Sequence, residues 1–118
     1  MASGSTKKAL LLTVLAAAIF AAGALATTPA PVVGNVKNGK RLFKAHLCGT
    51  CHVMSAAGIY DSNGTAPSLD HTRKTYAQIV AKITLGNIKK GMNPYKGALT
   101  TKEIQDVSAF VYKSAHAS

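Results

Sequence analysis

The sequence contains few acidic residues: 4 Asp and Glu stand against 14 Lys and Arg, which gives a formal net charge of +10 at pH 7. It shows no acid–base pair and no nucleophile with a partnered base, so it does not predict an enzyme. It also shows no internal repeat and no convincing strand pattern, which leaves helices to build the fold. A chain of 118 residues has room for one domain at most.

The first quarter of the chain differs in composition from the rest. Two lysines precede an apolar run over residues 9–22, and small residues follow at positions 24 and 26. This order is typical of a secretory signal peptide over residues 1–26. It leaves residues 27–35 as a flexible leader and residues 36–116 as the folded domain. The alternative is an uncleaved membrane anchor, because the apolar stretch reaches the lower limit of length for a membrane span.

The most informative motif is C-x-x-C-H, formed by Cys48, Cys51 and His52. It is typical of a site where haem c is attached covalently. Residues three apart on a helical turn lie on the same face, so both thiols can meet the edge of one porphyrin. His52 follows directly and is then held beneath the iron as a ligand.

Three other interpretations of the two cysteines fit less well. A thiol redox pair leaves His52 without a role, and no alternating strand and helix pattern surrounds it. A zinc site lacks a second Cys and His pair at ligand spacing. A disulfide across two residues closes too short a loop to stabilise much. The motif therefore predicts one haem c as the cofactor.

A helix is predicted over residues 38–47, leading into the motif. Gly39, Leu42 and Phe43 recur at helical spacing. Glycine inside a helix costs about 1 kcal/mol relative to alanine, so Gly39 predicts the close approach of another helix. Residues 53–71 contain turn-forming residues without a period, which predicts a long loop.

Two further helices carry sequence signals for their first residues. Thr75 with Gln78, and Thr100 with Glu103, have the spacing of capping boxes. Gly86 stands where the first of these helices should end. The expected apolar faces consist of Tyr76, Ile79, Val80 and Ile83, and of Ile104, Val107, Phe110 and Val111.

Met92, in the polar loop over residues 89–95, is the expected second iron ligand. A thioether is a soft, neutral ligand that suits ferrous haem. Met54 lies two residues from His52, too close along the chain to reach the opposite side of a haem. The rival ligands are histidines that we expect at the surface: His46, His71 and His116.

Over residues 36–115 the chain resembles the class I cytochromes c, which are small single-haem electron carriers. The matching residues are, in chain order, Gly39, Phe43, Cys48, Cys51, His52, Ala66-Pro67-Ser68-Leu69, Gly91, Met92, Pro94 and Phe110. The resemblance implies a small all-α fold of three to four helices packed around one covalently bound haem. It also implies export, to the periplasm or the outer face of the cytoplasmic membrane. One position departs from the family, which commonly has Met followed directly by Pro: here Asn93 intervenes.

The resemblance further implies roles for individual residues. Cys48 and Cys51 would form the thioether bonds, and His52 would bind iron through Nε2. The backbone carbonyl of Pro67 would accept the His52 Nδ1 proton, and Leu69 in the same loop would contact the haem. The first helix would cross closely over the last, with Gly39 near Phe110.

These features predict an exported cytochrome that carries single electrons. The alternatives are a haem subunit of a larger oxidoreductase, and a haem enzyme or gas sensor with an open distal site. The excess of lysine favours an acidic redox partner, with a membrane surface as a second partner. Nucleic acid is not expected, because the protein is exported and its basic residues do not alternate with aromatic ones.

Overall fold

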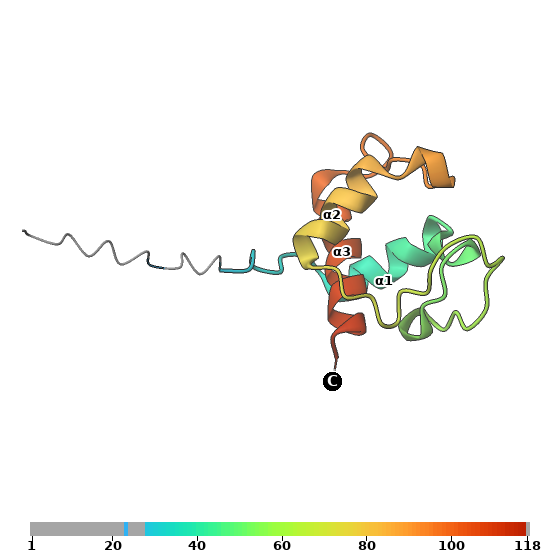
Figure 1. Cartoon of the computed structure of the whole chain (residues 1–118), viewed down its shortest axis with the longest axis horizontal. Coiled ribbons are helices and arrows are strands. Elements are labelled where there is room, and N and C mark those ends of the chain that lie inside the picture. The colour runs from blue at the N-terminus through green and yellow to red at the C-terminus, as the bar shows by residue number, and fades with distance from the viewer. Residues whose placement is uncertain (1–22, 24–27, 118) are drawn as a thin grey trace, which may run out of the picture.

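The computed structural model describes residues 23 and 28–117 (Figure 1). The predicted signal peptide or membrane anchor over residues 1–26 lies outside these residues, apart from Gly23. In the part of the chain that is described, no helix is long and apolar enough to cross a membrane.

Three α-helices build the domain, as the sequence predicted. They are α1 (Val36–Ala45), α2 (Tyr76–Leu85) and α3 (Thr101–Ala115). Three short 3₁₀ turns accompany them: η1 (Cys48–Thr50), η2 (Ser55–Ala57) and η3 (Ile88–Lys90). Within residues 23 and 28–117 the structure contains isolated β-bridges but no strand. The fold is therefore a small all-α one.

Both predicted capping boxes are confirmed. The Thr75 side chain accepts a hydrogen bond from the Gln78 backbone N–H, and the Gln78 side chain accepts one from the Thr75 N–H. Thr100 and Glu103 make the same reciprocal pair at the start of α3. Each box satisfies two of the backbone donors that a helix leaves unpaired at its first turn.

The first helix is shifted by two residues from its predicted position. It begins at Val36 because the Asn35 side chain caps it, accepting the Asn38 N–H at 2.9 Å. It ends at Ala45, and Leu47 then adopts a left-handed conformation with φ of 55°. A left-handed residue directly after a helix is a common way to end it.

The last helix is the centre of the fold. Figure 1 shows α1 (teal) and α2 (yellow) each lying against α3 (red). A Cβ atom on Gly39 would overlap the Asp106 carbonyl group and lie 2.8 Å from the Phe110 Cβ, which confirms the predicted close crossing. The Phe43 and Phe110 rings meet edge to face at 5.6 Å between centroids. This crossing fixes the direction in which α1 delivers the C-x-x-C-H motif.

The hydrophobic core lies where the three helices meet. Its buried residues are Leu42, Phe43, Met54, Ala57, Ile79, Leu99, Ile104, Val107, Phe110 and Val111. The predicted apolar stripe of α3 is fully buried, whereas on α2 only Tyr76 and Ile79 are buried, with Val80 and Ile83 half-buried at the edge of the core.

The predicted loop over residues 53–71 is more ordered at its start than its sequence indicated. Met54 and Ile59 form an antiparallel bridge around η2, with hydrogen bonds of 2.9 and 3.1 Å in the two directions. Met54 is fully buried in the core. The segment without helix or bridge therefore runs from residue 60 to residue 75.

Candidate haem site

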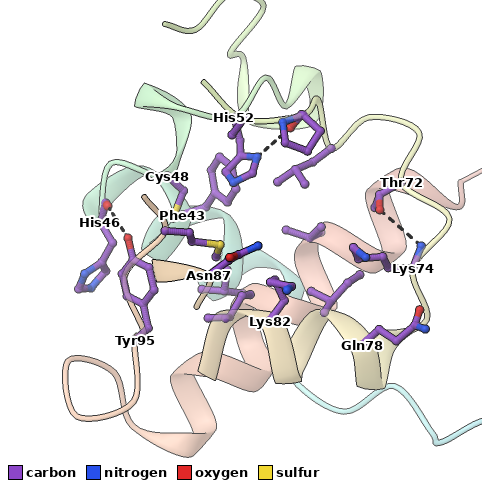
Figure 2. A pocket seen from close by; sticks show the side chains of 18 of the residues that line it. Phe43, His46, Cys48, His52, Thr72, Lys74, Gln78, Lys82, Asn87 and Tyr95 are labelled. Atoms are coloured by element: carbon purple, nitrogen blue, oxygen red, sulfur yellow. Dashed lines mark hydrogen bonds between the residues drawn. The ribbon is translucent and has the colours of Figure 1, made fainter. Parts of the chain in front are cut away.

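A cavity of about 840 Å³ lies between the helices and the loops that follow α1 and α2. Its floor is apolar and draws side chains from all three helices: Leu42 and Phe43 from α1, Ile79 and Ile83 from α2, Val107 and Val111 from α3. This volume falls within the range of cofactor sites, roughly 300–1,000 Å³. Figure 2 shows His52 and Cys48 on one side of the cavity and the α2 residues Gln78 and Lys82 on the other.

The C-x-x-C-H motif forms a single tight turn at the edge of this cavity. The Cys48 carbonyl accepts hydrogen bonds from the backbone N–H groups of Cys51 at 3.3 Å and His52 at 3.0 Å. The two cysteines form no disulfide with each other, and both are half-buried. Cys48 and His52 line the cavity, while Cys51 lies on the same turn beside it, where the Asn63 amide donates to its sulfur at 3.7 Å.

The Cys48 thiol does not resemble the reactive thiol of a redox pair. Burial raises the pKa of the Cys48 thiol, and the neighbouring Tyr95 hydroxyl opposes this shift only in part. Catalytic C-x-x-C pairs depend on a thiol whose pKa is lowered. The local electrostatics thus disfavour the thiol redox interpretation of this motif.

The imidazole of His52 is held in one orientation by Pro67. Its Nδ1 atom lies 2.8 Å from the Pro67 backbone carbonyl oxygen. A carbonyl oxygen only accepts, so Nδ1 must carry the proton. Nε2 is then left with a free lone pair, which is the form of histidine that binds a metal.

Met92 enters the same cavity from the loop after α2. It is paired with Asn87 in an antiparallel bridge, with hydrogen bonds of 2.7 and 3.1 Å between their backbones. Gly86 has a φ of 67°, and a Cβ atom there would lie 2.5 Å from the Met92 carbonyl oxygen and 2.6 Å from the Pro94 nitrogen. The close approach at Gly86 keeps the loop against the end of α2, and it accommodates the inserted Asn93.

The other candidate ligands are placed differently. Met54 is enclosed in the core, and His71 and His116 are exposed as expected. His46 is not at the surface as predicted: it is half-buried and lines the cavity. Tyr95 covers it, with the two rings edge to face at 6.1 Å and the Tyr95 hydroxyl 3.4 Å from the His46 carbonyl oxygen. No local pattern predicts this pair, because the two residues lie 49 positions apart.

Comparison with known proteins agrees with this geometry. The model of the family described as "Cytochrome C oxidase, cbb3-type, subunit III" matches residues 34–111. A "Cytochrome c6-like" protein of Nostoc sp. (strain PCC 7120 / SAG 25.82 / UTEX 2576) is 33% identical over 93 residues, which cover 75% of this chain and 78% of that protein. The chain belongs to the class I mono-haem cytochrome c family. No solved structure matches it significantly.

The cofactor of this cytochrome is therefore a covalently attached haem c. The cavity fits such a group in three respects: it is apolar in its interior, it has two thiols at the attachment spacing on one edge, and it has one free imidazole nitrogen. When bound, haem c supplies an iron that cycles between the ferric and ferrous states. Cys48 and Cys51 would hold it, His52 would bind the iron, and Leu69 in the cavity wall would pack against it.

The sequence showed an excess of lysine and placed Lys90 in the polar loop that carries Met92, but it did not place Arg73, Lys74 and Lys82 at this cavity. The side chains of Arg73, Lys74, Lys82 and Lys90 all line it. Among the described residues the ion pair is Lys102 with Asp106, so none of these four cations forms an ion pair with a carboxylate in that part of the chain. A positively charged rim on an apolar cavity suits a flat apolar cofactor that carries acidic groups at its edge. Their periodicity along the chain gave no signal, because they belong to a loop, a helix and a 3₁₀ turn.

Proposed function

We propose that this protein is an exported, single-haem c-type cytochrome that carries single electrons between redox partner proteins. The observation that supports it best is the pair of side chains that reach one apolar cavity. His52 offers an imidazole nitrogen with a fixed tautomer, and Met92 offers a thioether sulfur. With both as axial ligands, the iron would stay six-coordinate in both oxidation states and rearrange little on electron transfer.

The lining of the cavity supports a carrier rather than an enzyme. Among the described residues no Asp or Glu side chain lines it. A general acid or base must lie within hydrogen-bond reach of the reacting group. Among the described residues His46 is the one histidine there besides His52, and the Tyr95 ring packs edge to face against it at 6.1 Å between centroids. An enzyme or sensor would also need an open iron position, which Met92 would fill.

A haem subunit of a larger oxidoreductase is the second candidate. The family description names a subunit of a cbb3-type cytochrome c oxidase, which supports it. Such a subunit would stay with its complex through purification, whereas a free carrier would purify alone.

We further propose that the partner offers an acidic surface. Four cations line the cavity, and the exposed Lys89 precedes one of them, Lys90, in the chain, so positive charge gathers where an electron would enter or leave. Opposite charges steer encounter and raise the association rate at low salt. An anionic membrane surface would bind the same positive charges. Binding to vesicles that contain anionic lipid, but not to vesicles without it, would identify a membrane as the partner in place of a protein.

Visible spectra of the purified oxidised and reduced protein test the function. We expect a six-coordinate haem c in both states, and no spectral change when carbon monoxide is added to the reduced form. Carbon monoxide binding to the unmodified protein would show an open position and favour the enzyme or sensor alternative. The site of export cleavage is tested by intact mass, with Thr27 expected as the first residue of the secreted form.

A further inference from the structure

The side chain of Asp70 fastens the Pro67 loop to the segment that follows His52. Its Oδ1 accepts the Ser55 backbone N–H at 2.6 Å, and its Oδ2 accepts the Ser55 hydroxyl at 2.7 Å. These two hydrogen bonds lower the pKa of Asp70, so they bind the charged carboxylate. Neither residue lines the cavity.

The Asp70–Ser55 contact is one of several hydrogen bonds that join residues 52–55 to residues 67–70. One residue before it, the Leu69 backbone N–H donates to the Val53 carbonyl at 2.9 Å. Next in the series comes the Pro67 carbonyl, 2.8 Å from His52 Nδ1. Two segments are thus joined at three successive points, and the outermost point is the Asp70–Ser55 pair.

The loop that carries Pro67 packs against the hydrophobic core through the partly buried Leu69. Residues 60–75 form no helix or bridge, and Pro67 itself is exposed. Before Pro67, the loop is joined to the motif by the Asn63 N–H, which donates to the Thr50 carbonyl at 3.1 Å, and by the Asn63 amide at the Cys51 sulfur. Beyond Leu69, a mostly exposed loop without helix or bridge depends on such hydrogen bonds for its position.

We propose that Asp70 is a positioning residue: by clamping Ser55 it holds the Pro67 carbonyl against His52 and so sets the reduction potential of the haem iron. This rests on the proposed function, because it takes His52 as an iron ligand. A hydrogen bond at Nδ1 makes an imidazole a stronger donor to iron, which stabilises the ferric state. Loss of the clamp lets the Pro67 carbonyl move away and raises the potential.

Asp70→Ala removes both hydrogen bonds. We expect the ferric-to-ferrous equilibrium to shift at least threefold toward ferrous, which is roughly 30 mV upward, since tenfold equals about 59 mV for one electron. The His52 Nδ1 proton, followed by nuclear magnetic resonance in the reduced protein, should exchange with solvent at least tenfold faster. Ser55→Ala keeps the charge of Asp70 but loses one bond, so both readouts should shift in the same direction by less.

Two variants separate position from charge. Asp70→Asn loses the charge but can still accept the Ser55 N–H and donate to the Ser55 hydroxyl, so it should restore both readouts close to the parent. Asp61→Ala removes an equal charge from the same loop, where Asp61 bonds only the N–H of Ser62. It should leave both readouts unchanged. The potential is also measured in 1 M salt, where the Debye length is about 3 Å. A direct effect of the Asp70 charge on the iron is screened under this condition.

The proposal is overturned if Asp70→Ala keeps the parent potential and exchange rate. It is also overturned if Asp61→Ala or Asp70→Asn shifts them as much as Asp70→Ala does, since the effect would then be one of charge. The parent spectrum keeps this result distinct from failure of the proposed function. A parent without the spectrum of His and Met ligation contradicts the carrier function, whereas a normal parent spectrum with unmoved variants contradicts only the clamp.

Discussion

The backbone carbonyl of Asp106 occupies the space that a Cβ atom on Gly39 would need. The first and last helices touch at this point without any side chain between them. Beside this contact, the Phe43 and Phe110 rings pack against each other. The resulting orientation of α1 places Cys48 in the wall of the cavity. The position of the attachment motif thus depends on a residue nine positions earlier.

Gly39→Ala should therefore destabilise the protein. The methyl group meets a backbone carbonyl, which cannot rotate away, so we expect a loss of about 2–3 kcal/mol despite the better helix propensity of alanine. Denaturant unfolding of the holoprotein measures it. Lys40→Ala, on the exposed side of the same helix, should change the stability by less than about 0.5 kcal/mol. Equal stability of the two variants would contradict the close crossing.

Asp106 joins the same two helices through its side chain. Its Oδ1 accepts the Asn35 backbone N–H at 2.7 Å, and its Oδ2 accepts the Asn38 amide at 2.7 Å and the Lys102 ammonium group at 3.1 Å. The Asp106 side chain is 0% exposed, whereas that of Lys102 is 75% exposed. The carboxylate therefore caps the start of α1 from within the core.

Asp106→Ala should cost about 2–3 kcal/mol, because it leaves two donors of partly buried hydrogen bonds, the Asn35 N–H and the Asn38 amide, without their acceptor. Lys102→Ala should cost less than about 1 kcal/mol, because an exposed ion pair contributes little. Unfolding of both variants in denaturant gives the comparison. Similar losses in the two would show that the ion pair, and not the caps of Asn35 and Asn38, carries the stabilisation.

Asp106 should also make the stability depend on pH. Burial raises the pKa of its carboxyl group, but hydrogen bonds from Asn35, Asn38 and Lys102 outweigh burial, so the net pKa is lowered. A group whose pKa is lower in the folded state stabilises the fold above its unfolded pKa, about 3.9 for Asp. That contribution is lost as the pH falls through the folded pKa. The stability difference between the parent and Asp106→Asn should therefore be largest at neutral pH and shrink below about pH 4. A difference that is constant with pH would contradict the shift.

The features that the sequence predicted best are those that depend on neighbouring residues. The capping boxes at Thr75 and Thr100 and the C-x-x-C-H turn are local, because each depends on residues within five positions. Gly39 also gave a usable signal, since a glycine inside a helix needs a packing reason. Met92 was expected from its ligand chemistry as well as from the family resemblance, and Pro67 from the resemblance alone; both line the cavity.

The polar contacts that join distant segments could not be predicted from the pattern of residues along the chain. Asp106 meets Asn35 from 71 positions away, and Tyr95 covers His46 from 49. Periodicity describes one element at a time and carries no information about which polar groups meet across elements. One signal was present: Asp106 lies four residues before Phe110, on the buried stripe of α3, in a chain with only 4 acidic residues. An acidic residue on an apolar face requires a partner.

Covalent attachment is tested at Cys48. Because both cysteines should be bonded to haem, the haem of the parent should remain with the polypeptide in denaturing electrophoresis and in acid–acetone extraction. Cys48→Ala should leave at most one bond and lower the yield of holoprotein. Free extraction of the pigment from the parent, with two titratable thiols, would show that the motif does not attach haem.

The second iron ligand is tested at Met92, the side chain that separates a carrier from an enzyme. A neutral thioether favours ferrous iron, so Met92→Ala should lower the reduction potential. It should also remove the weak red absorption of methionine sulfur on ferric haem, and open the iron to carbon monoxide. Alanine at this position leaves the Asn87 bridge intact, because that bridge uses backbone groups only.

The matched control for this experiment is the other methionine of the described domain. Met54→Ala would leave a cavity in the core, because Met54 is fully buried, so Met54→Leu is the better variant. It keeps the volume and removes the sulfur. Its potential, red absorption and lack of carbon monoxide binding should match the parent. If Met92→Ala also keeps all three, then Met92 is not the ligand. His46 is then the next residue to replace, because it is the one other histidine in the cavity wall besides His52 among the described residues.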